Sequence, residues 1–166
     1  MNKIKPTSSD RVYGKLVKYR KGDCLSIDCK NGNYLGVLIS EKFNKYYDLT
    51  LIGYYKKEIP QLPDFVEGKF FGTRLGSWEE LTYAVNVWMI ECKEIDNDIK
   101  LEKIGTLKLT STFRKDGYAY LERAEQLLIH YLEELPIRIE KSKNAEKFPD
   151  LALVSKHLID MKHIIE

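Results

Sequence analysis

The fold predicted for this chain is decided by residues 24–40, Cys24-Leu-Ser-Ile-Asp-Cys-Lys-Asn-Gly-Asn-Tyr-Leu-Gly-Val-Leu-Ile-Ser40. Two β-prone runs, residues 24–28 and 34–40, flank a polar segment that contains Asn31-Gly32. Because Asn-Gly accepts the positive φ values that a tight two-residue turn demands, the stretch predicts a β-hairpin. Just upstream, Lys21-Gly22-Asp23 predicts a turn that leads into this hairpin.

Downstream of the hairpin, residues 47–55 predict a third strand, because apolar and polar side chains alternate there. Leu49 and Leu51 fall on one face, and Asp48 and Thr50 fall on the other. The alternation indicates that one face of this strand contributes to a core.

The next segments extend the sheet. Residues 56–64 predict a surface loop, because their two prolines can neither donate to a ladder nor continue a helix. Residues 83–91 are the most hydrophobic stretch and predict a central strand buried on both faces, in which Asn86 needs a polar partner. Residues 101–109 predict a further strand with a bulge at Gly105.

After Gly117 the apolar residues take helical spacing. Residues 118–135 predict an amphipathic helix that has Asp116 as its N-cap and ends at Pro136. A second helix is expected from Pro149 or Asp150 to the end of the sequence. The apolar stripe of the first consists of Leu121, Ala124, Leu128, Tyr131, Leu132 and Leu135. The stripe of the second consists of Leu151, Val154, Leu158, Met161 and Ile165.

Strands followed by helices predict an α+β fold. The expected architecture is an N-terminal antiparallel, strongly twisted sheet that could close as a barrel, covered by two C-terminal helices. A length of 166 residues fits a single domain. Within residues 1–166 we expect a leader at 1–14, a mainly β part at 15–110 and a mainly helical part at 111–166.

Composition and motifs argue against several functional classes. The net charge of +2 is too small to imply a polyanionic partner by itself. The three cysteines form no C-x-x-C pair, and His157 and His163 are six residues apart, so no disulfide framework, metal or cofactor is expected. No hydrolase motif is present, so we expect no catalytic residue and no enzyme. Without a signal sequence or a long apolar run, a cytoplasmic location with no membrane contact is expected.

Aromatic residues crowd the region around the predicted third strand. Exposed tyrosines with lysines beside them would form a protein-binding patch or stack bases, because tyrosine offers a large rigid area and a hydroxyl. The same pattern also fits tyrosines that pair across a sheet, and both interpretations stay open. The candidate partner-binding residues are Tyr46, Tyr47, Tyr54, Tyr55, Lys56, Lys57 and Trp78.

Several of these features together resemble the immunity protein 26 family of bacterial polymorphic toxin systems. The resemblance covers about residues 15–110 and leaves the C-terminal part unmatched. It implies a mainly β protein that neutralises a cognate toxin by binding it, with no catalytic residue to carry over. The residues that carry it are Lys21-Gly-Asp23, Ser26-Ile27, Asn31-Gly32 with Tyr34 and Gly36, the aromatic third strand, the proline loop and Lys103-Ile-Gly-Thr-Leu107.

One alternative comes from a different class of function. Residues 1–21 carry seven basic groups against Asp10 alone, so this arm could follow phosphates while the aromatic residues of the sheet stack bases. That arrangement would make a single-stranded nucleic-acid-binding module. An enzyme with an unfamiliar active site is the third hypothesis, and the sequence does not define the oligomeric state.

Overall fold

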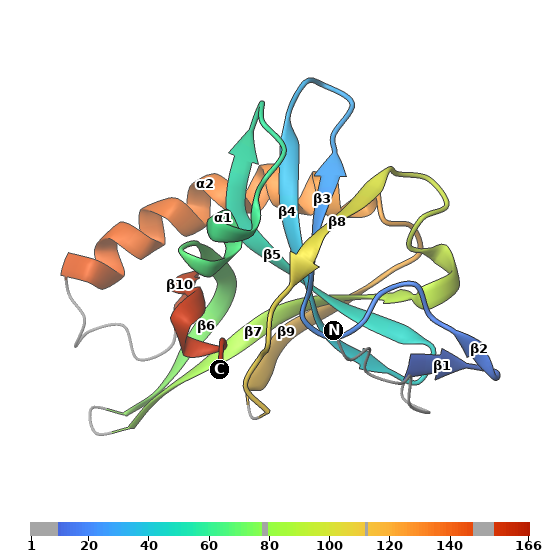
Figure 1. Ribbon diagram of the computed structural model, residues 1–166. Coiled ribbons are helices and arrows are strands. Elements are labelled where there is room, and N and C mark those ends of the chain that lie inside the picture. The colour runs from blue at the N-terminus through green and yellow to red at the C-terminus, as the bar shows by residue number, and fades with distance from the viewer. Residues whose placement is uncertain (1–9, 78–79, 112, 148–154) are drawn as a thin grey trace.

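The computed structural model describes residues 10–77, 80–111, 113–147 and 155–166. Among these residues, eight strands form one sheet in the order β10-β6-β7-β5-β4-β3-β8, and β9 pairs with β7 (Figure 1). The strands of this sheet are β3 (Asp23–Asp28), β4 (Tyr34–Phe43), β5 (Tyr46–Lys56), β6 (Lys69–Ser77), β7 (Glu80–Glu91), β8 (Leu101–Thr106), β9 (Arg114–Leu121) and β10 (Ser155–Asp160). A separate hairpin consists of β1 (Arg11–Val12) and β2 (Lys15–Leu16). The α-helices are α1 (Leu62–Val66) and α2 (Gln126–Lys147), and the short 3-10 helices are η2 (Cys92–Glu94) and η3 (Met161–His163).

The α+β class is confirmed, and the sheet is antiparallel except where β7 and β9 run parallel. The described strands do not close into a barrel, because β10 and β8 lie at opposite ends of the strand order. Residues 11–14 of the expected leader belong to the β1–β2 hairpin, together with Lys15 and Leu16 of the expected β part. The predicted proline loop is wrong at its end, where residues 62–64 begin the short helix α1. The first turn of α1 accommodates a proline because amides there need no helical acceptor.

The β3–β4 hairpin is confirmed, but its loop differs from the predicted two-residue turn. The amide of Cys29 donates to the carbonyl of Asn33 at 3.1 Å, so three residues form the loop. The positive φ values occur at Lys30 (60°) and Gly32 (90°). The side chain of Asn31 instead accepts a hydrogen bond from the amide of Asn33 at 3.0 Å, which stabilises the loop locally.

Two of the segments that carry the family resemblance, Lys21–Ile27 and Lys103–Leu107, lie side by side because β3 pairs with β8. Asp23 is buried, and it accepts a hydrogen bond from the hydroxyl of Thr106 at 2.7 Å and pairs with Lys103 at 3.3 Å. The amide of Leu107 donates to the carbonyl of Gly22 at 2.8 Å. The predicted bulge is present, since the register with β3 shifts between Gly105 and Lys103.

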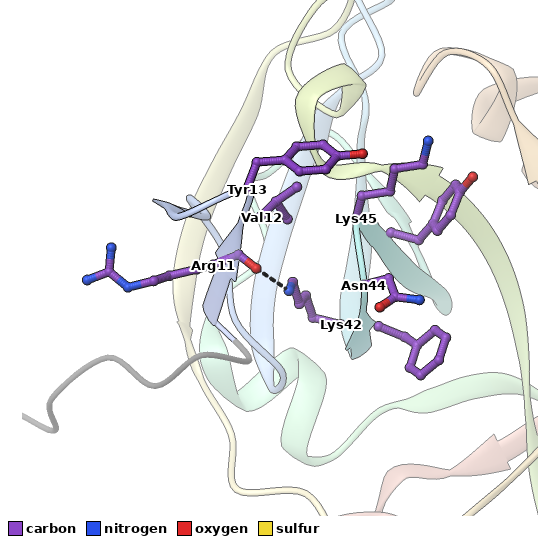
Figure 2. A pocket seen from close by; sticks show the side chains of 8 residues that line it. Arg11, Val12, Tyr13, Lys42, Asn44 and Lys45 are labelled. Atoms are coloured by element: carbon purple, nitrogen blue, oxygen red, sulfur yellow. Dashed lines mark hydrogen bonds between the residues drawn. The ribbon is translucent and has the colours of Figure 1, made fainter.

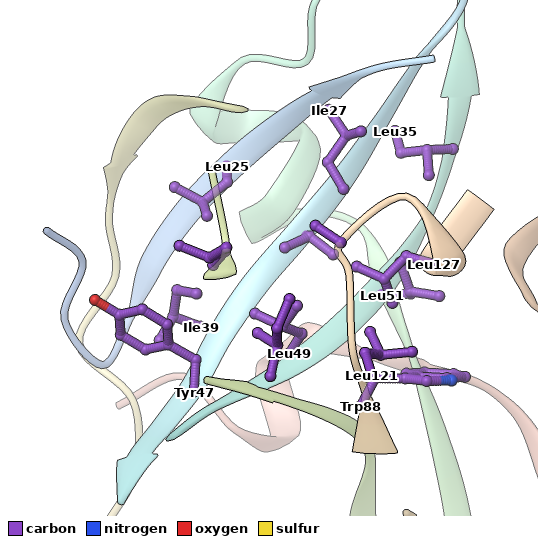
Figure 3. Close-up of a cluster of buried hydrophobic side chains, with 14 of the residues drawn as sticks. Leu25, Ile27, Leu35, Ile39, Tyr47, Leu49, Leu51, Trp88, Leu121 and Leu127 are labelled. Atoms are coloured by element: carbon purple, nitrogen blue, oxygen red, sulfur yellow. The ribbon is translucent and has the colours of Figure 1, made fainter. Parts of the chain in front are cut away.

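Alternation along the strands divides the buried side chains into two cores, one on each face of the sheet. Leu49 and Leu51 pack in the core beneath α2, together with Leu127 and Tyr131 of that helix (Figure 3). The other core lies against α1, whose Phe65 is fully buried. The prediction that Leu49 and Leu51 lie on one face of β5 and Thr50 on the other is therefore confirmed.

Asn86 of β7 has the polar partners that its buried position required. Its side-chain amide donates to the hydroxyl of Thr73 at 2.9 Å and to the carbonyl of Asp116, and its carbonyl accepts from Arg138 at 2.6 Å. Arg138 is 5% exposed and pairs with Glu134 at 2.9 Å. The network joins β6, β7, β9 and α2.

The expected first C-terminal helix is wrong at both ends. Residues 114–121 form β9, so Asp116 lies inside a strand and is not an N-cap. The helix begins at Gln126 and continues through Pro136 to Lys147. Pro136 is exposed, whereas Arg138, Ser142 and Ala145 beyond it are buried. The packing of these side chains on the sheet therefore compensates for the backbone hydrogen bond that a proline cannot donate.

The expected second C-terminal helix is wrong for residues 155–160, and within the described residues only the short 3-10 helix η3 (Met161–His163) is helical there. The predicted start lies outside the described residues. Residues 155–160 form β10, which pairs with β6 along its whole length. Leu158 packs in the core beneath α2, whereas Ile159 packs in the core against α1. Apolar residues on both faces of a strand mimic helical spacing, which explains the incorrect prediction.

Candidate functional site

The structure separates the candidate tyrosines into different environments. Tyr47 is fully buried, and its hydroxyl donates to the carbonyl of Tyr19 and accepts from the amide of Tyr19, both at 2.9 Å. Tyr54 is 6% exposed and donates to the carbonyl of Glu58 at 2.7 Å. Because their rings belong to the cores, Tyr47 and Tyr54 are not surface contact residues in this conformation.

The remaining candidates lie near the two ends of β5. Tyr55 is half-buried, and its hydroxyl accepts a hydrogen bond from Asn31 at 2.9 Å. Lys56 and Lys57 are exposed close to it. Tyr46 is half-buried at the start of β5. Trp78 lies outside the described residues.

Tyr46 belongs to a surface that combines exposed aromatic rings with cations. Tyr13 is 89% exposed and Phe43 is 64% exposed. The β1–β2 turn and the β4–β5 turn lie side by side, and a hollow of about 570 Å³ lies between them (Figure 2). We call this the tip surface, and it consists of Arg11, Tyr13, Lys42, Phe43, Asn44, Lys45, Tyr46 and Tyr120.

Tyr13 has an unusual backbone conformation. Val12 pairs with Lys15, so Tyr13 and Gly14 form a two-residue turn with φ values of 51° and 79°. Asn, Asp or Gly usually occupies the first of these positions, because a bulky side chain is disfavoured at positive φ. A tyrosine there places a large ring in solvent against the local preference, which is typical of a functional position.

Cations on the tip surface outnumber the carboxylates that neutralise them. The ammonium of Lys42 donates to the carbonyl of Arg11 at 2.9 Å, which fastens the β1–β2 hairpin to β4. Lys45 pairs with Glu91 at 3.4 Å. Within the described part of the chain, no carboxylate lies within ion-pair distance of Arg11 or Lys42. Their charges are therefore available to an acidic partner.

Aromatic contacts hold the centre of the tip surface. The rings of Tyr46 and Tyr120 pack edge to face with centroids 5.8 Å apart. Tyr120 is 52% exposed although it makes this contact, and the ammonium of Lys45 lies 5.6 Å from the centroid of Tyr46. A partner that docks here would meet rings already held in position, which lowers the entropic cost of binding.

A second hollow, of about 610 Å³, lies on the other side of the β4–β5 turn. Asp48 at its edge is buried and forms an ion pair with Lys115, which is 43% exposed. Burial raises the pKa of Asp48 above its ordinary value, and Lys115 opposes part of this increase. Burial therefore disfavours the charged form of this carboxyl, and Lys115 favours it.

We expect Asp48→Asn to raise the free energy of unfolding at pH 7 by roughly 1 kcal/mol. Between the ordinary pKa and the raised one, the folded protein binds more protons than the unfolded chain, so wild-type stability falls as pH rises through that window. Below the window the carboxyl is neutral in both states, and the advantage of the variant should vanish. Urea unfolding at several pH values measures this difference. A less stable variant at pH 7 would mean that the pair with Lys115 outweighs burial.

The three cysteine thiols are unactivated. Burial raises the pKa of Cys24 to about 12, and those of Cys29 and Cys92 to about 11, so all three thiols are protonated at neutral pH. No metal-binding group of His, Cys, Asp and Glu side chains occurs in the described ranges. In those ranges no helix is long and apolar enough to span a membrane.

No family model, curated protein or solved structure matches the chain. The tip surface is therefore defined by its geometry alone. Sequence reasoning included Tyr46 but missed Tyr13 and Tyr120, because it assigned them to a leader and to a helix. A signal for Tyr13 was present, since Tyr13-Gly14 lies between β-prone pairs and a glycine at that position favours a tight turn.

Proposed function

We propose that this chain is a bacterial immunity protein that neutralises a cognate toxin in the cytoplasm by direct protein–protein binding, without catalysis of its own. The observation that carries the proposal is the tip surface, in which exposed aromatic rings and unneutralised cations surround a hollow. An inhibitor of this kind needs only a stable scaffold and a complementary surface. The pairing of β3 with β8, which joins two of the segments of the family resemblance, is consistent with the proposal.

The charges of the tip surface specify the kind of toxin surface that would fit. Arg11 and Lys42 favour an acidic or neutral face, because they would repel a basic one. Tyr13 and Phe43 would supply the buried anchors, since aromatic side chains dominate the binding energy of many interfaces. The expected partner is thus a toxin domain with an apolar depression bordered by carboxylates.

The test is a pull-down of the tagged protein co-expressed with the product of the neighbouring gene, followed by calorimetric titration. We expect one stoichiometric partner bound at nanomolar affinity. Tyr13→Asn should keep the β1–β2 turn folded, because Asn-Gly suits that turn, and it should weaken binding about thirty-fold, as should Phe43→Thr. Ile137→Ala on α2 is the control, because that exposed side chain lies outside the tip surface. Unchanged affinity in both tip variants would refute the surface assignment.

A second candidate function is favoured by the same interleaving of rings and cations. Tyr13, Phe43 and Tyr46 could stack successive bases while Arg11 and Lys42 contact phosphates. Binding to single-stranded oligonucleotides would then weaken steeply as salt is raised, because counterions are released on binding. Fluorescence anisotropy with a labelled oligonucleotide at two salt concentrations tests this. A lack of binding at low salt would eliminate the nucleic-acid hypothesis and leave the toxin-binding proposal intact.

A further inference from the structure

Helix α2 carries a second apolar surface on the side that does not contact the sheet. Its buried residues, Leu127, Tyr131, Arg138, Ser142 and Ala145, face the rest of the domain. Another line of residues is exposed, and we call it the outer stripe. The outer stripe consists of Ile129, which is 60% exposed, Leu132 at 49%, Ile139 at 40%, and the exposed Pro136.

Spacings of three, four and three residues place the outer stripe on one face of the helix. The outward face of a helix that covers a sheet is normally polar. Here it presents a continuous apolar line along the middle of a 22-residue helix. A contiguous exposed apolar surface of this kind typically marks an interaction site.

The charges at the two ends of the outer stripe identify the partner that fits it. Glu125 directly precedes α2, in the turn that leads into the helix, where its carbonyl accepts from the amide of Leu128 at 3.0 Å and its side chain is 44% exposed. Lys143 lies one turn after Ile139 within the helix. Residue 134 is the midpoint of three residue pairs along this line: 129 and 139, 132 and 136, and 125 and 143. An antiparallel second copy of α2 centred at that level would therefore place apolar side chains opposite apolar ones and Glu125 opposite Lys143.

We propose that α2 of one copy packs antiparallel against α2 of a second copy through the outer stripe, about a two-fold axis level with residue 134. Such an interface is self-complementary, because each contact occurs twice. It ends in two Glu125–Lys143 ion pairs. In the monomer Glu125 lies 3.2 Å from Arg123 and Lys143 lies 3.9 Å from Glu140. Both pairs are exposed and contribute little, so they do not prevent the new ones.

The proposed interface is small. Four apolar positions on each helix give a contact at the low end of specific interfaces, so the expected Kd of the dimer is roughly 10–100 μM. The outer stripe and the tip surface share no residue. Dimerisation therefore leaves the tip surface free, and this inference does not depend on the proposed function.

The test is sedimentation velocity of the full chain over a range of concentrations that brackets the expected Kd. We expect wild-type protein to dimerise, and Glu125→Lys and Lys143→Glu to weaken dimerisation at least ten-fold each, because each replaces two attractions by two repulsions. Mixing the two variants should restore dimers, since every Lys then faces a Glu. The double variant on one chain should dimerise as wild type does. Lys141→Glu is the matched control, because Lys141 is exposed on α2 outside the outer stripe.

Three outcomes would overturn the proposal. One is a monomeric wild type throughout the concentration range. Another is a dimer whose affinity the single variants leave unchanged, which would place the interface elsewhere. The last is a failure of the mixed variants to associate while circular dichroism shows both to be folded, which would exclude the antiparallel register.

Discussion

Replacing Gly22 with alanine is expected to destabilise the protein by more than about 3 kcal/mol. The φ of Gly22 is +93°, and a Cβ there would lie 2.0 Å from the carbonyl oxygen of Leu107. The backbone of Leu107 cannot move away freely, because its amide donates to the carbonyl of Gly22 at 2.8 Å. The substitution should therefore break the connection between the turn and the segment after β8.

Gly32→Ala is the control that measures the cost of a side chain at positive φ without the steric clash that Gly22→Ala introduces. Gly32 has a φ of +90°, but no atom lies within 4 Å of the position of its Cβ. This control should cost only about 1 kcal/mol. Urea unfolding measures both variants, and loss of soluble folded protein is the readout if Gly22→Ala does not fold. Equal stabilities of the two variants would show that the close approach to Leu107 carries no energetic weight.

Arg138→Met is expected to lower the free energy of unfolding by about 3–5 kcal/mol. Methionine keeps much of the apolar volume over Phe71, whose ring centroid lies 4.8 Å from the guanidinium. It removes the donor to the side chain of Asn86 at 2.6 Å and to the carbonyl of Gly72 at 3.2 Å. Both acceptors would remain buried and lose a charge-assisted hydrogen bond.

Lys141→Met is the matched control for this prediction, because Lys141 is exposed on the same helix. Its cost should stay below about 0.5 kcal/mol. Chemical denaturation with linear extrapolation compares the two variants. A loss below about 1 kcal/mol for Arg138→Met would mean that water replaces the guanidinium in the Asn86 network.

Local turn chemistry made the N-terminal part of the fold predictable. Asn31-Gly32 located the hairpin, and the alternation around Leu49 assigned the faces of β5 correctly. A buried amide inside an apolar strand is costly without partners, so the need of Asn86 for a polar contact was also visible. The identity of its partner was not, because Arg138 is far away in the sequence.

The C-terminal part was mispredicted because long-range pairing determines it. β9 runs parallel to β7 after a long connection, and no local pattern announces such a pairing. β10 is buried on both faces, so its apolar residues show no strict alternation. The sequence pattern predicts a helix end at Pro136, whereas the buried residues after it hold the helix on the sheet.

The candidate site was predicted only in part. Clustering of aromatic residues identified Tyr46, but it could not distinguish rings in a core from rings in solvent, which is why Tyr47 and Tyr54 were included. The tip surface unites residues from β1–β2, β4–β5 and β9. Such a combination depends on tertiary structure and leaves no mark in a single stretch of sequence.

The pairing of β6 with β10 has a consequence for how the chain is made. β6 carries Phe70 and Phe71, and its outer edge is covered only by β10 among the described strands. Ribosomes add about 5–20 residues per second, so the roughly 80 residues between the two strands leave that edge open for several seconds. An unpaired edge with buried-type side chains invites association with other nascent chains. Chaperone binding during translation is therefore an expected part of the biogenesis of this protein.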